Sequence, residues 1–144
     1  MCARFRFCFR LTLSMARTNS EFDVIVVGAG PGGSNAAAVA LKGGLSVAQI
    51  DRYKFPRVKP CAGGMTIKAC DALQFDLSQS VRYTSNSIEM NLWNSHVNRF
   101  SNRLPILKMV LRPEFDNELV AQNLKCTAFR FFEGERVTGI AAYK

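Results

Sequence analysis

A cluster of glycines near the amino end of the chain has the spacing of a phosphate-binding turn. Gly28 would permit a tight turn, Gly30 would let the backbone approach a pyrophosphate, and Gly33 would let a helix pack closely on a strand. A helix that begins here would direct its first N–H groups and the positive end of its dipole toward the phosphates. A P-loop is excluded because no Gly-Lys-Ser/Thr follows. The candidate cofactor-binding residues of this turn are Gly28, Gly30, Gly32 and Gly33.

Asp51 is the second candidate ligand-binding residue. It lies 18 residues after Gly33, close to the spacing at which dinucleotide-binding units place a ribose-binding acid. Its carboxylate could accept hydrogen bonds from a ribose diol, and its charge would repel a 2′-phosphate. The pattern therefore favours FAD or NAD over NADP as the ligand. The alternative is that the segment is an ordinary glycine-rich turn and Asp51 a surface aspartate, without a ligand-binding role.

The segments around the turn predict one β-α-β unit. Residues 23–27 form a β-branched run typical of a buried parallel strand. The alanine-rich segment 34–42 has high helix propensity, and Gly43-Gly44 would end that helix. Residues 45–50 read as a second strand with Asp51 at its carboxyl end. This order predicts an α/β fold with a Rossmann-like FAD/NAD(P)-binding unit.

The remainder of the chain predicts additional, mainly antiparallel strands. Ile88, Met90 and Leu92 alternate with polar residues, as in a half-buried strand. Pro113 stands where a helix could begin, with Phe115 and Leu119 on one face. Further expected elements are a loop over 52–64, a short helix over 65–73, a strand over 105–111, and a hairpin of strands 127–132 and 137–143.

Three segments together resemble a known family. Residues 23–51 resemble the ADP-binding motif of FAD-dependent oxidoreductases, which many flavoproteins share. The loop 55–64, with Lys-Pro-Cys-Ala-Gly-Gly at its end, resembles the more specific cysteine–glycine loop of the geranylgeranyl reductase family. Residues 111–116 resemble the Arg-x-x-Phe-Asp segment of that family, whose fold is like that of para-hydroxybenzoate hydroxylase. The resemblance implies FAD as the cofactor and reduction of isoprenoid double bonds as the activity.

The resemblance also implies roles for residues outside the glycine turn. Cys61, Ala62 and Gly64 match a loop whose backbone lies by the flavin, and Arg112 matches an arginine that reaches the cofactor. Val137 falls near a position whose backbone lies by the adenine. Cys61 could instead be a small packing residue and Arg112 a solvated charge. No catalytic residue is assigned.

Two departures from the family pattern are expected to be tolerated. Gly32 stands where alanine is more usual, and Asp51 where glutamate is more usual. An FAD-dependent monooxygenase or halogenase of the same fold remains an alternative, because fold alone does not decide the substrate.

Composition excludes several other functions. The net charge of +8 includes four arginines and no acid in residues 1–20, so the rest has only a scattered excess and is not expected to bind nucleic acid. Five cysteines without a Cys-x-x-Cys pair are poor material for a zinc site and suggest a reducing compartment. His96, the single histidine, argues against a multi-histidine metal site. We expect no bound metal.

The chain is expected to hold a leader and one domain. Residues 1–20 have the composition of a transit peptide, could form a short cationic anchor at a membrane surface, or extend a chain whose translation starts at Met15. We favour the start at Met15, and in all three cases residues 1–20 are predicted to lie outside the fold. Residues 21–144 would form the amino-terminal portion of an FAD-binding domain, because the family's downstream Gly-Asp flavin motif does not occur before Lys144. An inactive nucleotide-binding module is therefore a further alternative. The expected location is cytoplasmic, with organelle targeting or peripheral membrane association through an apolar substrate left open, as is the oligomeric state.

Overall fold

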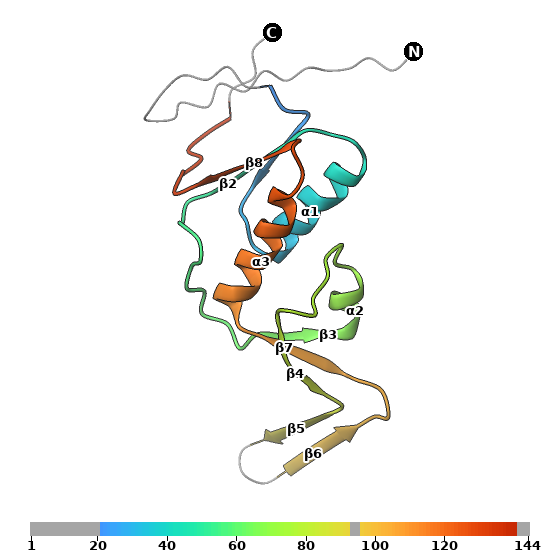
Figure 1. Cartoon of the computed structure of the whole chain (residues 1–144). Helices are drawn as coiled ribbons and strands as arrows, with labels where there is room; N and C mark the ends of the chain where they lie inside the picture. Colours follow the sequence, from blue (N-terminus) through green and yellow to red (C-terminus); the bar gives the residue numbers. More distant parts are fainter. Residues whose placement is uncertain (1–20, 93–95, 141–144) are drawn as a thin grey trace. The chain divides into compact units, whose positions relative to one another are not determined.

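The computed structural model describes residues 21–92 and 96–140 (Figure 1). The chain forms two compact units. Of the described residues, unit 1 comprises 21–55 and 119–140, and unit 2 comprises 56–92 and 96–118. The predictions for residues 1–20 and for residues 141–143 fall outside the described residues.

Unit 1 contains a three-stranded parallel sheet in the order β1-β2-β8. These strands are β1 (Val24–Val27), β2 (Val47–Asp51) and β8 (Phe129–Glu133), and α1 (Pro31–Lys42) connects the first two. Both pairings are parallel, with Val24 opposite Val47 and Val47 opposite Phe129. The predicted α/β fold is therefore confirmed.

The core of unit 1 explains why this segment folds as it does. Ala37 of α1, Val47 of β2 and Phe129 of β8 are buried against one another. Alanine keeps the helix close to the sheet, while the β-branched residues of β1 and β2 suit the pleated surface. The third helix, α3 (Arg112–Leu124), has Leu119 and Val120 buried in its second half.

The predicted hairpin at the carboxyl end is wrong. β8 pairs with β2 in parallel, from Val47–Phe129 to Asp51–Glu133. Gly134 has a positive φ of 75°, as expected for a turn, but residues 137–140 form no strand. Turn residues between two apolar runs suggested a hairpin, whereas burial of Phe129 beside β2 decides the pairing of the first run.

Unit 2 contains a three-stranded antiparallel sheet and a separate two-stranded hairpin. The sheet has the order β3-β7-β4, from β3 (Gly64–Thr66), β7 (Leu107–Val110) and β4 (Val81–Ser85). The hairpin pairs β5 (Ser87–Leu92) with β6 (His96–Ser101). The expected additional antiparallel strands are therefore present.

Several boundaries in unit 2 differ from the sequence prediction. The short helix α2 covers only Ile67–Asp71, because residues 64–66 pair with β7 as a strand. Thr66 caps this helix by accepting a hydrogen bond from the Ala69 N–H at 3.2 Å. The strands β4 and β6, the second of which begins at His96, were not predicted.

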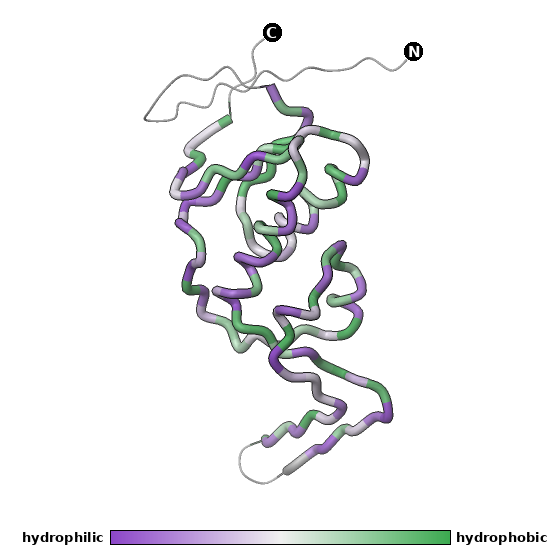
Figure 2. Tube along the Cα trace, in the orientation of Figure 1, coloured by the Kyte–Doolittle hydropathy of each residue, from purple (hydrophilic) through white to green (hydrophobic). Residues whose placement is uncertain are grey.

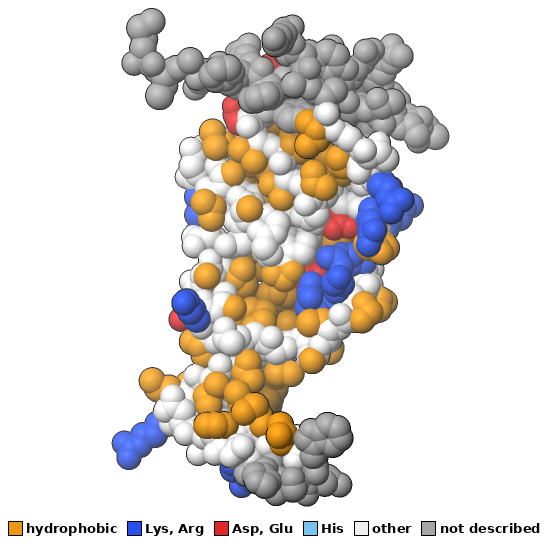
Figure 3. All heavy atoms as spheres, turned by 180° about the vertical axis from the view of Figure 1, so that it is seen from behind, with side chains coloured by type: hydrophobic (Ala, Val, Ile, Leu, Met, Phe, Trp, Pro, Cys, Tyr) orange, Lys and Arg blue, Asp and Glu red, His pale blue; other side chains and the backbone are white. Residues whose placement is uncertain are grey.

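Burial along β5 departs from the predicted pattern. Hydrophobic and hydrophilic residues alternate along the hairpin (Figure 2), yet only Ile88 is partly buried, whereas Met90 and Leu92 are exposed. Apolar side chains lie on the surface of unit 2 (Figure 3), among them Tyr83, Met90, Leu92, Phe100 and Leu104. Within the described ranges, no helix has the length and apolar character needed to cross a membrane.

Candidate dinucleotide-binding site

The glycine turn joins β1 to α1, as predicted. Gly28 follows β1 and has a φ of 101°, in the region that favours glycine. Gly30 is the N-cap of α1, with extended backbone and no capping side chain, and Pro31 occupies the first helical position. Proline has no N–H that would need a partner, and no side chain caps the helix. The N–H groups of Gly32 and Gly33 are therefore the next ones available to a ligand. This arrangement suits an anion at the helix amino end.

Gly33 makes the close helix–strand approach that its position predicted. A Cβ at residue 33 would lie 2.1 Å from the carbonyl oxygen of Gly28, a contact that real structures do not show. A Cβ at Gly32 would meet no atom within 4 Å. The spacing of the motif thus reflects packing at Gly33, whereas Gly32 can be replaced.

Asp51 lies at the carboxyl end of β2, where the sequence placed it, and is 7% exposed. Its Oδ2 accepts a hydrogen bond from the Ala29 N–H at 2.7 Å, and its Oδ1 accepts one from the Tyr53 N–H at 2.9 Å. The ribose-binding role was predicted; the bond to the glycine turn was not. Each carboxylate oxygen can accept more than one hydrogen bond, so Asp51 can hold the turn and still accept from a diol.

A buried polar network contacts the glycine turn and the start of α1, and the sequence analysis did not predict it. It includes Gln49 of β2, Ser34 of α1 and Asn123 of α3, all buried. Gln49 Nε2 donates to the Gly28 carbonyl at 3.1 Å, and Asn123 Nδ2 donates to the Ser34 carbonyl at 3.0 Å. The available signal was a glutamine between Ala48 and Ile50 in a segment predicted as a strand.

The second group of predicted residues is brought together within unit 2. Cys61 is exposed, and the Gly63 N–H donates to its Sγ at 3.4 Å. This backbone hydrogen bond, followed by a hydrogen bond from Arg112, lowers the pKa of the Cys61 thiol. Arg112 therefore lies next to the cysteine loop, whereas its predicted contact with the cofactor stays a prediction.

Arg112 is fixed by a carboxylate. Its Nε and Nη2 donate to Asp116 Oδ1 and Oδ2 at 2.8 and 2.9 Å, and this bond raises the pKa of the guanidinium. Arg57 Nη2 lies 3.1 Å from Asp116 Oδ2, with an Arg57 side chain only 9% exposed. Arg57 is therefore part of a buried ion pair and is not a solvated surface charge. Two arginines thus share one fully buried aspartate.

The glycine that constrains the cysteine loop is Gly63, which the motif comparison did not single out. Its φ is 75°, and a Cβ there would lie 2.0 Å from the Val110 carbonyl oxygen. The Gly63 carbonyl accepts a hydrogen bond from the Val110 N–H at 2.9 Å. Ala62 is exposed next to it, and Gly64 begins β3, where a Cβ would make only ordinary contacts.

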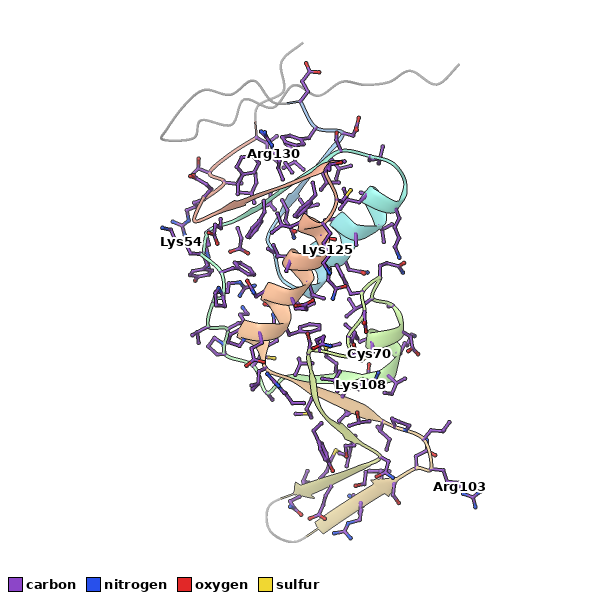
Figure 4. All side chains as sticks on the ribbon, viewed as in Figure 1. Lys54, Cys70, Arg103, Lys108, Lys125 and Arg130 are labelled. Atoms are coloured by element: carbon purple, nitrogen blue, oxygen red, sulfur yellow. The ribbon has the colours of Figure 1, made fainter. Side chains whose placement is uncertain are left out.

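Val137 is the last of the predicted cofactor-binding residues. Val137 is half-buried in irregular structure after β8, and its adenine-side role stays a prediction. Cys70 of α2, labelled in Figure 4 with Lys108 of β7, is buried, and burial raises the pKa of its thiol. No three His, Cys, Asp or Glu residues gather as a metal site within the described ranges.

Proteins with similar sequences are longer than this chain. No family model matches the chain. An uncharacterized protein of Methanosarcina barkeri is 41% identical over 120 residues, which is 83% of this chain and 31% of the relative. The menaquinone reductase of Mycolicibacterium smegmatis is 50% identical over 56 residues, 39% of this chain and 14% of that enzyme. The chain thus spans about a third or less of these relatives.

Solved structures show the same fold. A geranylgeranyl bacteriochlorophyll reductase-like protein from Thermoplasma acidophilum matches with a TM-score of 0.68 at 22% identity, over 83% of this chain and 33% of its own. The halogenase PltM, in complex with phloroglucinol and FAD, matches with a TM-score of 0.64 at 18% identity, over 85% and 29%. The chain therefore has the Rossmann-type fold found in FAD-dependent oxidoreductases and halogenases.

Proposed function

We propose that this chain is the FAD-binding portion of a flavin-dependent oxidoreductase of the geranylgeranyl reductase kind, which reduces isoprenoid double bonds. The observation that carries the proposal is the glycine turn held by β2. Gly28 N–H donates to the Ile50 carbonyl at 2.7 Å, and the Ala29 N–H donates to Asp51. These bonds fix a turn whose open end is the amino end of α1.

The residues of this turn fit the ADP half of FAD. The helix begins without a capping side chain, so its first N–H groups can receive a pyrophosphate. Asp51 supplies a carboxylate for a ribose diol at the end of the adjacent strand. When bound, FAD would supply hydride transfer, and the protein would bind and orient it.

The relatives support isoprenoid compounds as the substrate class. One structural neighbour is described as geranylgeranyl bacteriochlorophyll reductase-like, and the mycobacterial relatives are menaquinone reductases. Geranylgeranyl groups and menaquinone side chains are both isoprenoid. Such a substrate would also favour peripheral association with a membrane. The flavin ring of FAD would then lie near the Lys-Pro-Cys-Ala-Gly-Gly loop, which contains Cys61, Ala62 and Gly64, and near Arg112. The adenine of FAD would lie near Val137.

A flavin-dependent halogenase or monooxygenase is the second candidate. PltM has a similar fold, and its structure holds an aromatic compound, phloroglucinol, together with FAD. The two candidates share the glycine turn and Asp51. They differ in the substrate. Turnover assays with a polyprenyl alkene and with a phenol plus halide would separate them in a longer protein that also carries the downstream Gly-Asp flavin motif.

Calorimetric titration with ADP, FAD, NAD and NADP tests the proposal. We expect ADP and FAD to bind and NADP to bind more weakly, because Asp51 repels a 2′-phosphate. Since the chain spans about a third of its relatives, we expect the 144-residue protein to bind FAD weakly, to lose it on gel filtration, and to show no alkene reduction with chemically reduced flavin. Absence of ADP and FAD binding would refute the proposal, and retained FAD with turnover would refute the expected inactivity.

A further inference from the structure

Gln49 is a polar side chain at the centre of a buried parallel strand. It is fully buried in β2, whose other residues are also buried. Its Nε2 donates to the Gly28 carbonyl oxygen at 3.1 Å and to Ser34 Oγ at 3.4 Å. One amide group thus contacts both the glycine turn and the first turns of α1.

The carbonyl oxygen of the Gln49 side chain destabilises the fold. Within the described residues, Gln49 Oε1 is buried and has no hydrogen-bond partner. A buried acceptor without a partner destabilises a protein, and an apolar side chain of the same shape would avoid that penalty. The benefit of glutamine at this position must therefore lie in the two groups that its Nε2 holds.

Asn123 holds the same helix start from another element. It is buried in α3, and its Nδ2 donates to the Ser34 carbonyl oxygen at 3.0 Å. Ser34, which is fully buried, therefore has its side chain bonded to β2 and its carbonyl bonded to α3. The Ser34 N–H donates to the Gly30 carbonyl at 2.9 Å, which connects these contacts to the N-cap.

Three successive residues of β2 form hydrogen bonds with the glycine turn. Gln49 donates to the Gly28 carbonyl, Ile50 accepts from the Gly28 N–H, and Asp51 accepts from the Ala29 N–H. Both backbone polar groups of Gly28 are thus bonded to β2. The first and third of these contacts are made by side chains, so they depend on residue identity.

We propose that Gln49 and Asn123 are positioning residues of the dinucleotide site, which hold the glycine turn in its ligand-binding conformation before the ligand arrives. The inference rests on the proposed function, because the ligand is the ADP moiety of FAD. A turn that is already ordered loses less conformational entropy on binding, so pre-organisation raises affinity without a direct contact to the ligand.

Replacement of Gln49 by methionine separates positioning from packing. Gln49→Met keeps the length of the side chain and removes both the donor and the unpartnered acceptor. We expect an unchanged or raised melting temperature, faster amide hydrogen exchange at Ala29, Gly30 and Gly32–Ser34, and ADP affinity lower by about tenfold, the scale on which supporting hydrogen bonds act at ligand sites. Asn123→Leu should act in the same direction, and Gln74→Met, at an exposed glutamine in unit 2, is the matched control.

A second variant gives a pH signature that packing alone would not produce. In Gln49→Glu the ionised carboxyl cannot donate to the Gly28 carbonyl, whereas the protonated carboxyl can. Gln49 lies beside Val26 and Phe131 in the sheet, and α1 carries no charge before Lys42. Asp51, two residues further along β2, and burial would both raise the pKa of the introduced carboxyl. FAD affinity of this variant relative to wild type should therefore recover as the pH falls.

The outcomes distinguish this inference from the proposed function. If wild type binds neither ADP nor FAD, both fail. If wild type binds and Gln49→Met matches it in affinity and in amide exchange, the positioning role alone is refuted. A parallel loss of melting temperature and affinity in Gln49→Met, without pH-dependent recovery in Gln49→Glu, would also refute it, because it would show a purely structural role.

Discussion

The carboxylate of Asp51 accepts a hydrogen bond from the Ala29 N–H at 2.7 Å, across 22 residues of sequence. This contact joins the end of β2 to the glycine turn. Asp51 therefore stabilises the glycine turn that would bind the phosphates, in addition to the ribose contact that its position implies. Its removal should change the turn as well as the ribose contact.

For Asp51→Ala we expect ADP binding to weaken by about 1–3 kcal/mol, the usual cost of losing hydrogen bonds to a charged group. Asp51→Asn keeps an acceptor for the Ala29 N–H and removes the charge, so it should lose less affinity and discriminate less against NADP. Calorimetry measures both effects. Equal ADP affinity in wild type and Asp51→Ala would remove Asp51 from the site.

The adjacent glycines Gly32 and Gly33 provide a matched pair of substitutions. A Cβ at residue 33 would overlap the Gly28 carbonyl at 2.1 Å, whereas a Cβ at residue 32 would meet nothing within 4 Å. We expect Gly33→Ala to lower the melting temperature and abolish ADP binding. Gly32→Ala should leave both intact, with a slight gain in stability from better helix propensity. Similar behaviour of the two variants would contradict this packing argument.

The shared aspartate of unit 2 should be important for stability. Asp116 is fully buried between Arg57 and Arg112, and removing one partner of a buried ion pair leaves an uncompensated charge. Asp116→Ala should therefore lower the free energy of unfolding by about 3–5 kcal/mol in urea denaturation.

An exposed ion pair on the same helix is the control for Asp116→Ala. Glu114 pairs with Arg82, and both side chains are about half exposed. Glu114→Ala should change the free energy of unfolding by less than about 1 kcal/mol, as is usual for surface pairs. Equal stability of the two alanine variants would show that the buried cluster of Arg57, Arg112 and Asp116 contributes no more to the free energy of unfolding than a surface ion pair.

The sequence predicted best where local pattern and burial agree. The strand before Gly28, the helix after it and the strand that ends at Asp51 were all placed within a few residues, because glycine spacing, alanine content and β-branching indicate the same unit. The partner of β8 could not be read locally. Its parallel pairing with β2 depends on the burial of Phe129 beside Val47, far away in the sequence.

The site divides in a similar way. Direct ligand candidates such as Gly30 and Asp51 belong to a spaced motif, whereas Gln49 and Asn123 act only through contacts across many residues. The partner of Arg57, Asp116, follows 59 residues later in the sequence, so local pattern does not reveal this ion pair. Only the fold brings such charges together.

The last prediction concerns the reactivity of Cys61. A hydrogen bond from the Gly63 N–H and the nearby Arg112 lower the pKa of this exposed thiol, while Asp116 opposes them by raising it. A lowered pKa means more thiolate at neutral pH, and thiolate is the form that reacts with iodoacetamide. In a pH series read by peptide mass spectrometry, the alkylation midpoint of Cys61 should lie below its value in urea, and Cys70, whose thiol pKa burial raises, should react more slowly.

Substitutions of the two charged neighbours should move that midpoint in opposite directions. Arg112→Gln removes a donor and a positive charge, so the Cys61 midpoint should rise toward its value in the unfolded chain. Asp116→Asn removes the negative charge that raises the pKa while keeping the size of the side chain, so the midpoint should fall. A shift of the same sign in both variants would indicate loosening of the loop. A Cys61 midpoint that is equal in folded and unfolded protein would show that the cluster does not activate the thiol.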